Sequence, residues 1–133
     1  MNNRELQLPD MPGFEDFYGA VNDRAPFPWQ RRLAQQVSEC SEWPAEIGVP
    51  TGLGKTACLD IAVWWLASQA HLPSERRSAP TRIWWVVNRR LLVDEASKHA
   101  AQIQAMLRDP SSVRNTEQTD VMRSVAFRLR SLA

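Results

Sequence analysis

The chain has 133 residues and a mass of 15.2 kDa, which is enough for one small domain. Its composition is 44% hydrophobic and 23% charged, which is ordinary for a globular protein and excludes a disordered or fibrous chain. The formal net charge is only +1, so any contact with nucleic acid has to be argued from local residues. Cys40 and Cys58 match no metal-ligand spacing, and we interpret them as reduced thiols in a reducing compartment.

No segment has the features of a secretory signal or a membrane helix. The first residues, Met1–Glu5, are polar and precede no apolar stretch. The longest apolar runs, Ile61–Ala67 and Ile83–Val87, are far shorter than the roughly 20 residues that a membrane helix needs. We therefore expect a cytoplasmic protein without a membrane partner.

The first half of the chain predicts two helices and a strand. Apolar residues at spacings of three and four predict a short helix over 14–21. Pro28 suits the first turn of a second helix, which we expect from Trp29 to about Glu39. The apolar segment Ala45–Pro50 is too short for a globular helix and ends at a glycine-rich turn, so we interpret it as a buried strand.

The second half predicts three helices and another strand. Helical spacing of apolar residues predicts a helix over Lys55–Ala70, and a polar loop over 71–80 follows it. Thr81–Val87 is a β-branched and aromatic run, typical of a strand buried on both faces. Further helices are predicted over Arg89–Leu107 and over about Asp120–Leu132.

Strands that alternate with long helices favour an α/β fold with a parallel sheet. Only two strands are visible, so we expect an incomplete domain with unpaired strand edges. Its apolar faces would be uncovered, which predicts a marginally stable or aggregation-prone product. The side chains expected to be uncovered are Trp64, Trp65, Trp84 and Trp85.

The segment Val49–Thr56 reads Val-Pro-Thr-Gly-Leu-Gly-Lys-Thr, between a predicted strand and a predicted helix. Gly52 and Gly54 allow a positive φ and a close approach of the backbone to phosphates. The N–H groups of such a turn, with a helix N-terminus behind them, bind anionic oxygens. Lys55 supplies a charge for the β and γ phosphates, and Thr56 supplies a hydroxyl ligand for magnesium.

Val49 occupies the position of the first glycine in the strict Walker A pattern, which is a departure from it. A glycine-rich turn between strand and helix that binds nothing therefore remains an alternative.

Pro-Thr-Gly-x-Gly-Lys-Thr resembles the phosphate loop of superfamily 2 (DEAD/DEAH-type) helicases. The segment Pro26–Gln30 resembles the proline-aromatic-glutamine element upstream of that loop, in which the glutamine hydrogen-bonds adenine. The resemblance implies that Lys55 and Thr56 act in catalysis and that Thr56 contacts Mg²⁺. The residues that it implies for ATP binding are Gln30, Thr51, Gly52, Leu53, Gly54, Lys55 and Thr56. The alternative for Gln30 is a polar residue on a solvated helix face.

The segment Ile83–Ala96 resembles the superfamily's motif Ia, which contacts the nucleic-acid backbone. Together with the phosphate loop it is similar to the helicase-nuclease of type I CRISPR systems, an antiviral defence, in the type I-U or I-G branch. Asn88 stands where that branch has an aspartate. Arg89 and Arg90 are the residues that we expect to contact a DNA strand. Two solvated arginines at a strand end are an equal alternative.

The resemblance implies an incomplete RecA-like P-loop NTPase domain, with a lead-in over residues 1–25 and the first part of the domain over 26–133. Its implied partners, in a longer parent protein, are single-stranded DNA, a CRISPR effector complex and the remainder of the helicase chain. The acidic magnesium motif and the second RecA-like domain are not in the sequence, so we expect ATP binding without useful hydrolysis. The alternatives are an RNA helicase, a restriction translocase, or a non-enzymatic regulator.

Overall fold

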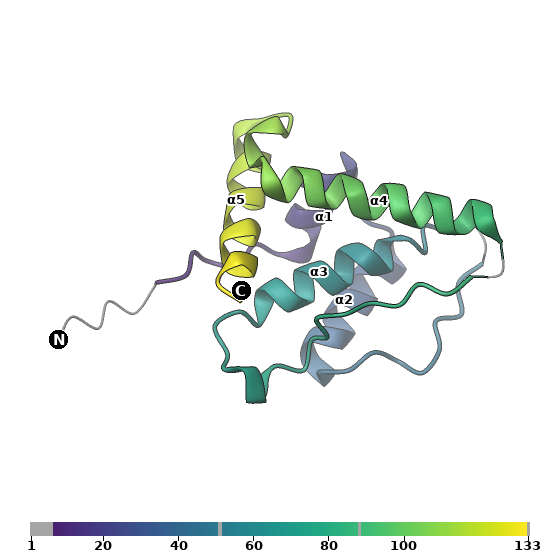
Figure 1. Cartoon of the computed structure of the whole chain (residues 1–133). Helices are drawn as coiled ribbons and strands as arrows, with labels where there is room; N and C mark the ends of the chain where they lie inside the picture. The colour runs from purple at the N-terminus through teal and green to yellow at the C-terminus, as the bar shows by residue number, and fades with distance from the viewer. Residues whose placement is uncertain (1–6, 51, 88, 133) are drawn as a thin grey trace.

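The structure, a computed structural model, describes residues 7–50, 52–87 and 89–132. These residues form five α-helices and two short 3₁₀ helices (Figure 1). The elements, in chain order, are α1 (Phe14–Asn22), α2 (Pro28–Cys40), α3 (Ala57–Ser68), η1 (Ser74–Arg76), α4 (Arg90–Arg108), η2 (Pro110–Ser112) and α5 (Thr116–Arg130).

The expected α/β fold with a parallel sheet is wrong, because the described residues contain no strand. The two predicted strands, Ala45–Pro50 and Thr81–Val87, belong to stretched connections that lead into α3 and α4 (Figure 1). β-Branched and apolar residues favour an extended backbone, but a strand exists only where its N–H and C=O groups pair with a neighbour. In the described part of the chain, no backbone hydrogen bond joins these two segments.

The five predicted helices are confirmed, with shifts of up to four residues at their ends. Proline does occupy the first position of α2, where a missing N–H costs nothing. The largest shift is in α5, which begins at Thr116 rather than near Asp120. The side chain of Asn115 accepts a hydrogen bond from the N–H of Gln118 at 2.9 Å, so this cap sets the earlier start.

Helix α3 lies at the centre of the molecule because it is apolar on all sides. Ile61 and Trp65 belong to a hydrophobic cluster with residues of α1 and α2. Leu59 and Ala67 belong to a second cluster with residues of α1, α4 and α5. The expectation that Trp65 would be uncovered is therefore wrong, since only 1% of it is exposed. Trp84 is 86% exposed, as predicted.

Helix α1 supplies side chains to both clusters, so it packs in the core together with the later helices. Phe14 and Tyr18 lie in the cluster with α2, and Phe17 and Val21 lie in the cluster with α4 and α5. Helices α3 and α4 begin toward the same end of the molecule, on the right in Figure 1. None of the described helices has the length and apolar character needed to cross a membrane.

Candidate functional site

The loop before α3 has the backbone conformation that its glycines were expected to provide. Gly52 has φ of 87° and Gly54 has φ of 79°, both in the left-handed region that favours glycine. Two residues after Gly54 the chain enters α3, with Thr56 as the cap residue. The motif therefore forms a tight turn at a helix N-terminus, although the strand expected before it is not present.

Two side chains at the start of α2 hold this loop through its carbonyl groups. The indole N–H of Trp29 donates to the carbonyl oxygen of Leu53 at 2.8 Å. The amide Nε2 of Gln30 donates to the carbonyl oxygen of Gly54 at 3.0 Å. Both bonds join residues that are 24 positions apart, so they hold the turn against a helix that precedes it in the sequence.

Gln30 is fully buried, which rules out the alternative of a residue on a solvated helix face. Its Oε1 accepts a hydrogen bond from the backbone N–H of Phe27 at 2.8 Å while Nε2 contacts Gly54. In this structure the amide therefore joins the start of α2 to the loop. The adenine contact that the resemblance implies for Gln30 would compete with these bonds.

The approach of Gln30 also explains why glycine is needed at position 54. A Cβ atom at Gly54 would lie 2.6 Å from Nε2 of Gln30, closer than side-chain carbons approach other atoms. The positive φ would add backbone strain for any other residue. Gly52 also has a positive φ, but a Cβ atom there would meet no other atom. Of these two glycines, only Gly54 is therefore restricted both by its φ and by a close contact.

The N–H groups of the turn are available to a ligand. Within the described residues, the backbone N–H groups from Gly52 to Thr56 make no hydrogen bond, whereas the carbonyl groups from Leu53 to Thr56 bond to α2 or to the first turn of α3. The side chain of the cap residue, Thr56, makes no capping hydrogen bond. Free N–H groups at a helix N-terminus carry partial positive charge and attract anions.

Besides the two glycines, three of the predicted ligand residues belong to this turn. Lys55 and Leu53 are exposed, and Thr56 is half-buried. Thr51, the remaining residue of the predicted site, lies outside the described residues. In the described part of the chain no group of three or more acidic, histidine or cysteine side chains is placed to hold a metal ion. A magnesium ion here would therefore depend on the Thr56 hydroxyl and on phosphate oxygens.

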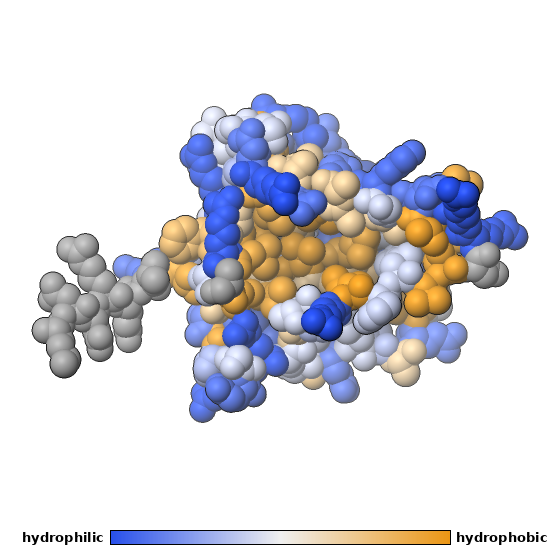
Figure 2. Space-filling model, viewed as in Figure 1, coloured by the Kyte–Doolittle hydropathy of each residue, from blue (hydrophilic) through white to orange (hydrophobic). Residues whose placement is uncertain are grey.

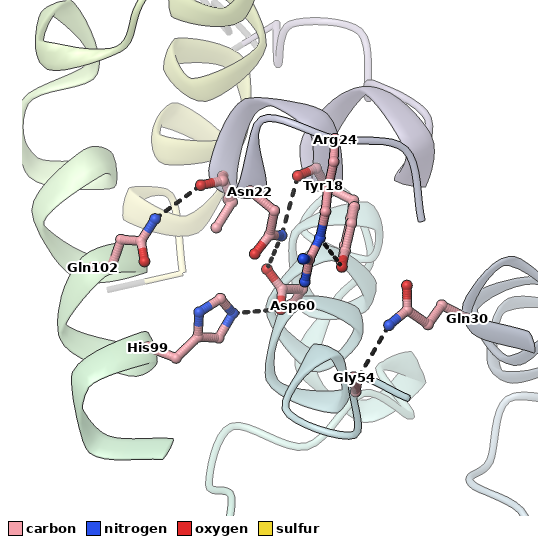
Figure 3. A network of polar contacts seen from close by, with 9 residues as sticks. Tyr18, Asn22, Arg24, Gln30, Gly54, Asp60, His99 and Gln102 are labelled. Carbon is pink, nitrogen blue, oxygen red and sulfur yellow. Dashed lines mark hydrogen bonds and ion pairs between the residues drawn. The ribbon is translucent and has the colours of Figure 1, made fainter. Parts of the chain in front are cut away.

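A buried carboxylate in the first turn of α3 ties this helix to its neighbours (Figure 3). Asp60 is fully buried, accepts a hydrogen bond from Nδ2 of Asn22 at 3.2 Å, and lies 2.6 Å from Nε2 of His99. Asn22 belongs to α1 and His99 to α4, so Asp60 links three helices. The carboxylate thereby has two partners that offset the cost of its burial.

Burial also affects the acidity of the Cys58 thiol, which follows the loop. Desolvation, and secondly the nearby Asp60 carboxylate, raise the pKa of the Cys58 thiol, and these effects exceed the lowering effects of its own backbone and of Lys55. The thiol is therefore held in its neutral, less reactive form.

The two arginines expected to contact a nucleic-acid strand lie at the start of α4. Arg89 is the cap residue of α4 and Arg90 is its first residue, and both are exposed. Neither forms an ion pair within the described residues. Asn88, which precedes them, lies outside the described residues.

The sequence interpretation missed the Asp60–His99 pair and the hydrogen bond from Trp29 to the loop. Thirty-nine residues separate Asp60 from His99, so no local spacing could associate them. One signal was available: Asp60 is an acidic residue inside the apolar run of α3, and such a residue needs a partner when it is buried. Comparisons with protein-family models, curated proteins and solved structures found no match for this chain.

Proposed function

We propose that the loop Val49–Thr56 binds the phosphates of ATP, and that the chain is the ATP-binding segment of an ATP-dependent DNA helicase or translocase. One observation carries the proposal: the turn at the start of α3 presents backbone N–H groups that have no partner among the described residues, beside an exposed lysine. Trp29 and Gln30 hold the turn by its carbonyl groups, so its N–H groups are left for an anion.

Different groups of the loop contact different parts of magnesium-ATP. The N–H groups from Gly52 to Thr56 donate hydrogen bonds to phosphate oxygens, and Lys55 adds a full positive charge. The Thr56 hydroxyl is the protein ligand for the magnesium ion that accompanies ATP, and this ion neutralises part of the phosphate charge. The fixed turn means that little ordering is required on binding.

The chain alone is expected to bind ATP without hydrolysing it at a useful rate. Phosphoryl transfer needs a positioned metal, an oriented water and charge stabilisation of the transition state. Among the described residues, Lys55 and Thr56 are available for these tasks, but no acidic cluster that could hold a metal ion lies beside them.

The link to type I CRISPR interference rests on the resemblance of two segments, the phosphate loop Val49–Thr56 and Ile83–Ala96. Exposed Arg89 and Arg90 support a contact with the phosphates of single-stranded DNA. The effector complex and the rest of a helicase chain would then be the partners of the parent protein.

Isothermal titration calorimetry with magnesium-ATP tests the proposal. Lys55→Ala is expected to weaken binding at least tenfold, about 1.4 kcal/mol, because it removes the charge next to the phosphates. AMP, which lacks the β and γ phosphates, should bind weakly to both proteins. Lys98→Ala is the matched control, since Lys98 is the other lysine of the chain, is exposed on α4 and is not part of the loop. Equal weakening by both substitutions, or equal affinity for AMP and ATP, would contradict the proposal.

A further inference from the structure

A second candidate site lies on the opposite side of α3 from α2. Side chains of α3, α4, α5 and the connection after η1 line a groove with a volume of about 670 Å³. Figure 2 shows it as a hollow with an apolar floor and polar residues along its rim. Its apolar lining includes Ala62, Val63, Leu66, Ala100 and Leu129. Among the described residues of the loop, 49–50 and 52–56, none lines it, so it is separate from the proposed ATP site.

Among the described residues, the two charged side chains that line the groove belong to arginines. Arg108 is the last residue of α4, Arg130 is the last residue of α5, and both are exposed. Nη2 of Arg130 donates to the carbonyl oxygen of Leu107 at 3.3 Å, so the two helix ends lie next to each other. The groove therefore carries positive charge at one end and has an apolar surface along the rest.

Shape and charge together specify the chemistry of a ligand. A volume within roughly 300–1,000 Å³ and a mostly apolar lining are typical of small-molecule sites. Guanidinium groups pair with carboxylates through two parallel hydrogen bonds. The C-terminal dipoles of α4 and α5 disfavour an anion, and two full positive charges at the same end outweigh the partial charges of about one half each.

We propose that this groove binds a fatty carboxylate, with its alkyl chain along α3 and α4 and its head group at Arg108 and Arg130. The proposal does not depend on ATP binding. Burial of each methylene contributes about 0.8 kcal/mol, so affinity should rise about fourfold per methylene. The head group should add a further contribution that a neutral head group of the same chain length lacks.

Calorimetric titration of the whole chain with decanoate and dodecanoate, below their micellar concentrations, tests the proposal. Dodecanoate is expected to bind about 15-fold more tightly than decanoate, because two methylenes are added. Dodecan-1-ol should bind at least tenfold more weakly than dodecanoate. Equal affinities of the acid and the alcohol would overturn the assignment of the head group to the arginines.

Matched variants show where the alkyl chain of the ligand binds. Ala100→Trp fills the groove from an exposed helix position and should reduce dodecanoate affinity at least tenfold, whereas Ala101→Trp, exposed but outside the groove, should not. The double substitution Arg108→Gln and Arg130→Gln should reduce it about tenfold, and Arg123→Gln should have no effect.

Two results would overturn the proposal. The first is dodecanoate binding that Ala100→Trp leaves unchanged. The second is a dimer, detected by sedimentation, that covers the groove and excludes dodecanoate. Lys55→Ala should leave dodecanoate binding intact, so failure of this proposal is distinguishable from failure of the ATP proposal.

Discussion

Gln30 has both ends of its side-chain amide bonded to backbone groups, one at Phe27 and one at Gly54. The sequence could identify this residue through the proline-aromatic-glutamine pattern, but it could not show that the amide is buried. The contact depends on how α2 packs beside α3, which no local pattern contains. The structure therefore supports a role in positioning the loop.

Gln30→Ala is expected to weaken binding of ATP and GTP by the same factor. The substitution leaves the Phe27 N–H without a partner and leaves the Gly54 carbonyl with only the N–H of Ala57, so the free energy of unfolding should fall by roughly 1–3 kcal/mol. Nucleotide titrations and urea denaturation measure the two effects. Gln35→Ala, at an exposed position of the same helix, is the control. Weaker binding of ATP with unchanged binding of GTP would instead support the adenine contact implied by the resemblance.

Cys58 differs from Cys40 in its surroundings, which predicts different reactivity. Cys40 is exposed, whereas burial and the Asp60 carboxylate raise the pKa of the Cys58 thiol. Because the thiolate is the reactive form, alkylation of Cys58 should need a higher pH than alkylation of Cys40. Iodoacetamide labelling from pH 7 to 10, followed by peptide mass spectrometry, gives both rates. Parallel pH profiles for the two cysteines would refute the expected difference.

Among the elements, helices were predictable and strands were not, for a physical reason. A helix satisfies its hydrogen bonds within one segment, so the spacing of apolar residues in α1 and α4 was sufficient evidence. A strand depends on a neighbour, and the apolar run Thr81–Val87 carries no information on whether one is available. In the described part of the chain that run leads into α4 without backbone pairing.

Arg128 is expected to stabilise the C-terminal end of α3. Its guanidinium group is buried and donates to the carbonyl oxygens of Ala67, Ser68 and Pro9 at 2.8, 3.3 and 2.9 Å. Arg128→Ala removes these charge-assisted bonds, and the free energy of unfolding should fall by about 3 kcal/mol. Arg123→Ala, at an exposed position of α5, should change it by less than about 0.5 kcal/mol. Equal effects of the two substitutions in denaturant unfolding would contradict this role.

At the scale of the whole molecule, α3 separates two surfaces with different chemistry. Its N-terminus presents the free N–H groups of the loop, and one side along its length forms the floor of the apolar groove. The chemistry of the loop was predictable because it lies within eight consecutive residues. The groove was not, since four segments separated in sequence combine to form it.

The central claim is that the N–H groups at the start of α3 bind the phosphates of ATP. Nuclear magnetic resonance of ¹⁵N-labelled protein, titrated with magnesium-ATP, observes these groups directly. We expect the largest shifts at the amides of Gly52, Gly54 and Lys55, and their loss in Lys55→Ala. Unchanged loop amides at saturating magnesium-ATP, or shifts confined to residues outside the loop, would contradict the claim.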